Sequence, residues 1–90
     1  MAEGALKNRI TQWLKGHPDT WFIKVHGSAY GRAGCPDIII CHKGRFIGAE
    51  LKAGRNKPTK LQIHEMEQIE QAGGLAGVVR SIDDLEELMQ

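Results

Sequence analysis

The sequence has few of the residues that mark secreted, membrane-bound or zinc-binding proteins. Among its 90 residues are only two cysteines, Cys35 and Cys41, and they are too few and too poorly spaced for a zinc site. No apolar run approaches the roughly 20 residues of a membrane span. The opening residues, Met-Ala-Glu-Gly, resemble neither a signal peptide nor a transit peptide. We therefore expect an intracellular protein whose thiols are reduced and have no chemical role.

The composition predicts an ordinary globular domain. Apolar residues make up 41% of the chain and charged residues 26%, as in most globular proteins. The chain is long enough for one hydrophobic core without disulfide or metal staples, and internal repeats and low-complexity segments are absent from it. We expect a single domain spanning residues 1–90.

The formal net charge of +1 hides an uneven distribution. Residues 1–60 contain eleven of the twelve Lys and Arg residues against four acids, a net charge of +7, whereas residues 61–90 contain one Arg against seven acids, a net charge of −6. A basic surface around a few acidic groups is typical of proteins that bind a phosphate backbone. The alternative is a mixed, solvated charge pattern with no partner.

Hydrophobic periodicity, turn residues and caps predict an α/β fold. We expect helices over residues 3–15 and 60–72 and a short helix that begins after Ser81. The expected strands are 21–26, 37–42, 45–52 and 75–80. Thr59 and Gln62 match a capping box at the start of the second helix. One antiparallel hairpin and helical crossovers imply a mixed sheet with helices packed on it.

The hairpin brings two carboxylates together. Lys43-Gly44 is a two-residue turn, and counting back from it places Asp37 opposite Glu50. Directly opposed side chains have Cβ atoms about 4.5–5.5 Å apart, and like charges there destabilise a sheet. A cation between them removes that cost. Lys52 lies on the same strand face as Glu50, so the pattern indicates a divalent metal ion beside an ammonium group, which suits phosphodiester hydrolysis.

A structural explanation competes with this one: Asp37 caps a turn, and Glu50 and Lys52 form a solvated strand face. The apolar run 38–40 favours the functional interpretation. A strand that is apolar on both faces is expected to be covered on both faces, which leaves no water-exposed side for Asp37 or Glu50.

Two further polar residues have two explanations each. Glu3 lies at the edge of the apolar face of the first helix, but an acid in a first turn is also a favourable partner of the helix dipole. For Glu3 alone the dipole is the better explanation. Gln62 belongs to the capping box and is equally well placed for a role in the site.

The chain resembles the virus-type replication-repair nuclease (VRR-NUC) branch of the PD-(D/E)XK nuclease superfamily. The resemblance spans nearly all 90 residues, and the element order matches the restriction-endonuclease-like αβββαβ core of that superfamily. Its motifs are Gly34-Cys-Pro-Asp37, Phe46-Ile-Gly-Ala-Glu-Leu-Lys52 and Lys57-Pro-Thr, followed by Gln62.

The resemblance implies a role for each motif residue. Asp37, Glu50 and the Leu51 carbonyl would bind Mg²⁺ or Mn²⁺, with Glu3 as a further ligand. Lys52 would orient or deprotonate the attacking water or neutralise the phosphate, and Gln62 would line the site. The candidates for nucleic-acid contact, taken from the basic loop and from the resemblance, are Ser28, Arg32, Arg55, Lys57 and Lys60.

The function implied by the resemblance is a metal-dependent, structure-selective DNA endonuclease acting on branched DNA such as four-way (Holliday) junctions, as a homodimer. Two alternatives remain open from the sequence: a non-catalytic nucleic-acid-binding module of the same fold, and a nuclease directed at RNA. The intact set of Asp37, Glu50 and Lys52 counts against the non-catalytic module.

Overall fold

The fold was analysed in a computed structural model that describes residues 2–25 and 32–90. The elements, in chain order, are α1 (Glu3–Lys15), β1 (Thr20–Lys24), β2 (Ile38–His42), β3 (Arg45–Leu51), α3 (Lys60–Gln71), β4 (Leu75–Val79) and α4 (Ile82–Met89). This order confirms the predicted α/β class with a mixed sheet. Within the described ranges, no helix is both long and apolar enough to cross a membrane.

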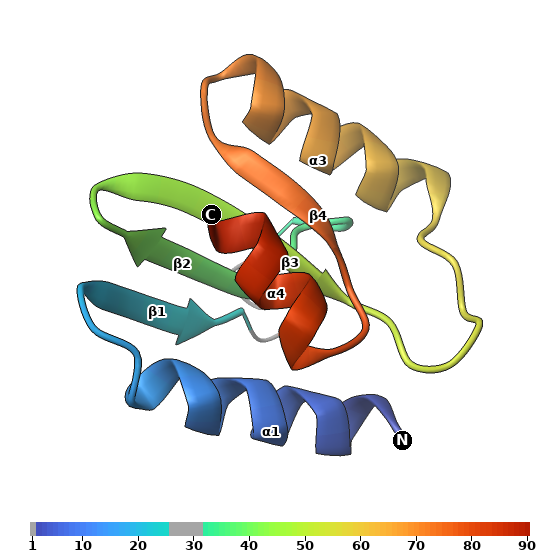
Figure 1. Cartoon of the computed structure of the whole chain (residues 1–90). Helices are drawn as coiled ribbons and strands as arrows, with labels where there is room; N and C mark the ends of the chain where they lie inside the picture. The colour runs from blue at the N-terminus through green and yellow to red at the C-terminus, as the bar shows by residue number, and fades with distance from the viewer. Residues whose placement is uncertain (1, 26–31) are drawn as a thin grey trace.

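The described strands form one four-stranded sheet in the order β1-β2-β3-β4 (Figure 1). The pairs β1–β2 and β2–β3 are antiparallel, and the pair β3–β4 is parallel because α3 crosses over between them. Lys43 and Gly44 have φ angles of 52° and 78°, as expected for a tight two-residue hairpin turn. The turn sets the predicted register, with His42 opposite Arg45 and Ile40 opposite Ile47.

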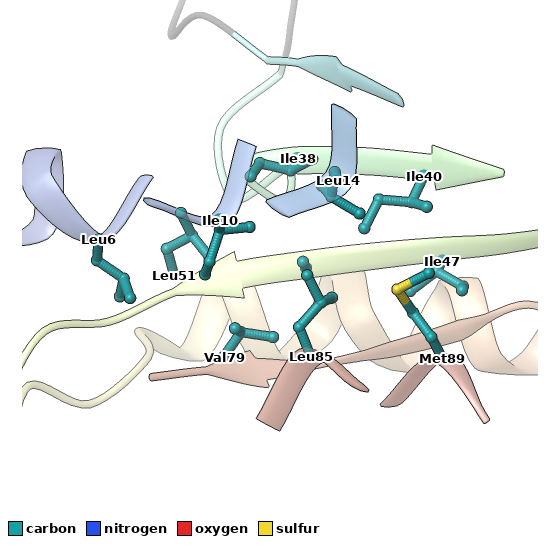
Figure 2. Packing of buried hydrophobic residues seen from close by; sticks show 11 residues of the cluster. Leu6, Ile10, Leu14, Ile38, Ile40, Ile47, Leu51, Val79, Leu85 and Met89 are labelled. Carbon is teal, nitrogen blue, oxygen red and sulfur yellow. The ribbon is translucent and has the colours of Figure 1, made fainter. Parts of the chain in front are cut away.

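The main core lies between one face of the sheet and the helices α1 and α4 (Figure 2). Leucine and isoleucine side chains from α1 meet alternate residues of β2 and β3, while Leu85 and Met89 close the core from α4. The buried residues of this cluster are Leu6, Ile10, Leu14, Ile38, Ile40, Ile47, Ala49, Leu51, Val79, Leu85 and Met89. In α1 the buried residues Leu6, Ile10 and Leu14 are each four positions apart. This spacing puts them on one face of a helix, which explains why the segment packs as one.

Helix α3 covers the opposite face of the sheet, over β3. A Cβ atom added to Gly48 would lie 2.8 Å from Pro36 Cγ and 2.9 Å from Ile69 Cδ1, so α3 and the segment before β2 both pack directly on the β3 backbone. The predicted capping box is present: Thr59 Oγ1 accepts from Gln62 N–H, and Gln62 Oε1 accepts from Thr59 N–H. Because Gly48 has no side chain, α3 can pack closely on β3, the strand that carries Glu50.

The expectation that β2 is covered on both faces is wrong. Ile38 and Ile40 are buried, but Ile39 is half-buried and Cys41 is exposed. On the same face of the neighbouring strands, Trp21 is 60% exposed and Phe46 is 44% exposed. The physical reason is that α3 packs over β3 and β4 and leaves the β1–β2 side of this face open. Among the described strands, β3 is the one that is buried continuously, from Ile47 to Leu51.

Candidate active site

The hairpin places the two predicted carboxylates next to each other. Ile38 pairs with Ala49, so Asp37 and Glu50 follow as the next pair at the end of the hairpin. Asp37 is also tied to the partner strand, because the Leu51 N–H donates a 2.8 Å hydrogen bond to Asp37 Oδ2. The Asp37 carbonyl accepts from Val25 N–H at 2.8 Å. These two contacts tie Asp37 to the residue that follows β1 and to the last residue of β3.

Glu50 is the most deeply buried charged residue among those described, with 1% of its surface exposed. Its Oε1 atom has no hydrogen-bond partner in the described part of the chain. The pKa of Glu50 is raised to about 8. Burial is the largest cause, followed by the charge of Asp37 and a side-chain hydrogen bond with Asp37, while Lys52 opposes the rise. A buried carboxylate oxygen without a hydrogen-bond partner is costly, and a cation bound at Oε1 would offset that cost.

Lys52 completes the local charge pattern that the sequence predicts. Its Nζ atom lies 3.7 Å from Glu50 Oε2, and the lysine side chain is 13% exposed. The Lys52 backbone is held by a bond from its N–H to the Val79 carbonyl at 3.2 Å. Asp37, Glu50 and Lys52 therefore converge at one end of the sheet, from the start of β2 and the end of β3.

These residues fit a hard divalent cation that keeps several non-protein ligands. Within residues 2–25 and 32–90, no three His, Cys, Asp or Glu side chains gather closely enough to hold a metal ion. Two carboxylates and a backbone carbonyl nevertheless suit Mg²⁺, which is usually bound by one or two carboxylates together with water and substrate phosphates. The unpartnered Glu50 Oε1 is the observation in favour of this fit.

Glu3 and Gln62 lie at the margins of this arrangement. Glu3 is exposed in the first turn of α1, and its charge is the smallest of the influences that raise the pKa of Glu50. It is thus near Glu50 without joining a three-carboxylate group. The side-chain oxygen of Gln62 is used by the cap of α3. The capping role of Gln62 is seen directly, and the site roles of Glu3 and Gln62 remain predictions.

The predicted nucleic-acid contacts fall into three groups. Arg55, Lys57 and Lys60 are exposed in and just after the loop that leaves Lys52. Arg32 instead forms an ion pair with Glu65 of α3, with Nη2 and Oε1 2.9 Å apart, although its side chain is 76% exposed. Ser28 lies outside the described residues. Of the predicted contacts that the structure describes, Arg55, Lys57 and Lys60 form no ion pair, whereas Arg32 does.

Sequence reasoning missed Arg80, which joins the basic loop in space. Arg80 Nη1 donates a 2.8 Å hydrogen bond to the Gly54 carbonyl. It is the only Lys or Arg in the acidic last third of the chain, and it directly follows a strand parallel to β3. Since parallel neighbours end at the same edge of a sheet, those two facts together were a usable signal.

Comparison with known proteins supports the fold rather than a particular activity. No protein-family model matches the sequence, and no curated protein matches it either. A solved structure described as a "VRR_NUC domain protein" is 22% identical in sequence and superposes with a TM-score of 0.81. The match covers 100% of this chain and 86% of that structure's chain. A second, described as "VRR_NUC domain", is 25% identical over 96% of this chain and 91% of its own, with a TM-score of 0.76. The chain therefore has the VRR-NUC fold, which is a nuclease-type fold.

Proposed function

We propose that this protein is a metal-dependent endonuclease that hydrolyses phosphodiester bonds in DNA. The observation that carries the proposal is the buried Glu50 carboxylate, which has one oxygen without a partner and lies beside Asp37 and Lys52. Structural ion pairs do not normally leave a buried carboxylate oxygen unsatisfied. A site that receives a cation and a phosphate accounts for both the burial and the missing partner.

In this proposal Asp37 and Glu50 hold one or two Mg²⁺ or Mn²⁺ ions, with the Leu51 carbonyl as a further ligand. Asp37 Oδ2 already accepts from the Leu51 N–H, so its other oxygen is the one that faces a cation. Such a cation supplies a water of lowered pKa and stabilises charge on the phosphate. The protein itself supplies the rigid hairpin that keeps the two carboxylates in place before the substrate arrives.

Lys52 is the residue that we assign to the reacting phosphate. Its ammonium is 3.7 Å from Glu50 Oε2 and is only slightly exposed, so it adds positive charge in a region from which water is largely excluded. Electrostatic interactions are stronger in such a region than in bulk water. Lys52 then neutralises the pentacovalent phosphate or orients the attacking water.

We propose branched DNA, such as a four-way junction, as the substrate and a symmetric homodimer as the active form. The support for the homodimer is an apolar row across three strands, in which Trp21 pairs with Cys41 and Cys41 pairs with Phe46. The branched substrate follows from the dimer, whose two sites would act on two symmetric strands. We call Trp21, Ile23, Cys41 and Phe46 the open face. All four are exposed, and an apolar patch of this kind is typical of an interaction surface.

A second copy of the chain is the partner that this face fits best. Two of its residues belong to β1, which is an edge strand of the described sheet, and an edge strand can extend an interface by pairing with a strand of another chain. A two-fold dimer presents the same patch on both subunits and gives two metal sites for two symmetric strands. A stable interface needs about 800 Å² from each partner, so the open face would form the apolar centre and polar residues the rim.

The proposal is tested by incubating the purified protein with labelled linear, flap, splayed-arm and four-way-junction DNA, and with matched RNA, in Mg²⁺, Mn²⁺ or EDTA. We expect cleavage only with metal and most efficiently on the junction. Glu50→Gln and Lys52→Ala should each reduce the rate by about 10²–10³-fold, while the exposed Glu67→Gln should not. Wild-type cleavage rates in Glu50→Gln would rule out the assigned site. Cleavage of RNA but not of DNA would mean that RNA is the substrate.

A further inference from the structure

The end of β4 lies beside the metal-binding carboxylates. Val79 pairs with Leu51 in the parallel register, and the Val79 carbonyl accepts from Lys52 N–H. Arg80, the next residue, is therefore adjacent to Lys52 at the same edge of the sheet. The acidic last third of the chain thus contributes its one Lys or Arg to the same end of the sheet as Asp37 and Glu50.

Arg80 links β4 to the loop that contains Arg55 and Lys57. Its bond to the Gly54 carbonyl uses Nη1, and an arginine side chain has five N–H donors in all. Among the described residues, the Arg80 guanidinium forms no ion pair, although the Arg80 backbone N–H donates a 2.9 Å hydrogen bond to Asp84 Oδ2. Its charge is therefore available to an anion from outside the chain.

Arg9 approaches the same place from α1. A cleft of about 270 Å³ is lined by Leu6 and Arg9 of α1 and by residues 80–83. Arg9 is exposed and, like Arg80, has no ion-pair partner in the described part of the chain. The cleft also includes one acid, Asp83, which forms no ion pair with either guanidinium among the described residues.

We propose that Arg9 and Arg80 bind a backbone phosphate of the DNA strand in this cleft, next to the phosphate that is cut. The inference rests on the proposed nuclease function and adds a substrate contact to it. Guanidinium groups pair well with phosphate oxygens because their planar donors match that geometry. A phosphate held here is displaced from the metal site toward α1, so the contact sets the direction in which the strand crosses Asp37 and Glu50. Arg9 and Arg80 are thus positioning residues.

Binding measured without cleavage tests this contact. The affinity for a fluorescein-labelled four-way junction and for a linear duplex is measured by anisotropy in EDTA over a series of KCl concentrations. Arg9→Ala and Arg80→Ala should each weaken binding about tenfold or more and reduce the salt-dependence slope by about one unit. Arg80→Lys should restore part of the affinity, and Asp83→Asn should tighten binding because it removes the acid from the cleft.

Arg45→Ala is the matched control. It removes the same charge from an exposed position next to the hairpin turn, at the opposite end of β3, and should change affinity by less than about twofold. If Arg45→Ala weakens binding as much as the two test variants, only the overall charge matters and the contact is refuted. The Asp83→Asn result keeps the test valid if Arg80→Ala does not fold.

The experiment also separates this inference from the function on which it rests. A wild-type protein that cuts DNA while Arg9→Ala and Arg80→Ala bind like Arg45→Ala overturns the phosphate contact alone. A wild-type protein that neither binds nor cuts nucleic acid overturns the proposed function and this contact together. Unchanged kcat with a raised KM in the two variants, measured with Mg²⁺, supports positioning rather than a role in the chemical step.

Discussion

Asp37 and Leu51 are joined across the hairpin: the Leu51 N–H donates a 2.8 Å hydrogen bond to Asp37 Oδ2. The strand that carries Glu50 thereby orients the opposing carboxylate as well. Asp37 Oδ2 accepts a hydrogen bond that stabilises the hairpin, whereas the negative charge of Asp37 repels Glu50 and would attract a cation. The hydrogen bond and the charge therefore affect stability in different ways. Two substitutions at this position can measure them independently.

Asp37→Asn should keep the bond and lose the charge, whereas Asp37→Ala should lose both. The asparagine oxygen can still accept from Leu51 N–H, and the repulsion with Glu50 disappears, so unfolding in EDTA at pH 8 should occur at an equal or higher temperature than for wild type. The alanine variant should lose about 1–3 kcal/mol because a backbone donor lacks its acceptor. Both should lose cleavage. Equal destabilisation by the two substitutions would contradict this view of Asp37.

The stability of the metal-free protein should fall as the pH rises from 5 to 8. The pKa of Glu50 is raised to about 8, so between its ordinary value and 8 the folded protein retains a proton that the unfolded chain has released. The stabilisation is complete below the ordinary pKa and is lost as the pH approaches 8, with a slope of up to about 1.4 kcal/mol per pH unit. Urea unfolding in EDTA measures it. Glu50→Gln should flatten the slope, and the exposed Glu67→Gln should not.

Millimolar Mn²⁺ or Mg²⁺ should raise the melting temperature, and more at pH 8 than at pH 6. A ligand that binds only the folded state stabilises by mass action, by about 2.7 kcal/mol at a hundred times its Kd. Metal binding must displace the proton on Glu50, so it becomes more favourable as the pH rises. Asp37→Asn should remove the response. Identical melting of the wild type in EDTA and in Mn²⁺ at pH 8 would show that the carboxylates do not bind the ion.

The features that the sequence predicts correctly are those set by local rules. The Lys43-Gly44 turn determines the hairpin register, and through it the placement of Asp37 opposite Glu50 follows by counting residues. Thr59 and Gln62 define the start of α3 for the same reason, since their capping contacts span three residues. These contacts depend on neighbours in the chain, so pattern and spacing suffice to predict them.

The features that the sequence does not predict depend on packing between distant segments. The apolar run 38–40 suggests a strand covered on both faces, but coverage depends on where α3 lies after its crossover. Because Gly48 lets α3 pack against β3, the helix lies away from β1, and Trp21 remains exposed. The Arg80–Gly54 contact spans 26 residues and has no local signature.

Gly48→Ala should destabilise the protein and reduce cleavage together. The added Cβ would lie under 3.0 Å from Pro36 Cγ and from Ile69 Cδ1, and Pro36 directly precedes Asp37. Overpacking of this kind typically costs about 1–3 kcal/mol, which urea unfolding can measure. Gly4→Ala is the control, because an added Cβ there meets no atom within 4 Å and alanine is favoured in a helix. Equal stability of the two variants would mean that α3 can move away from β3 without cost.

Trp21→Glu should convert a homodimer to a monomer without unfolding it. Trp21 is 60% exposed, so a charge there costs the monomer little but would be buried without a partner in a dimer that uses the open face. Light scattering should give about twice the 10.0 kDa chain mass for wild type and the chain mass for the variant, with paired cuts in junction DNA lost. Ile63→Glu, at an exposed position of α3 that is not part of the open face, should remain dimeric. A wild type that is monomeric at working concentrations and still makes paired cuts would remove the dimer from the mechanism.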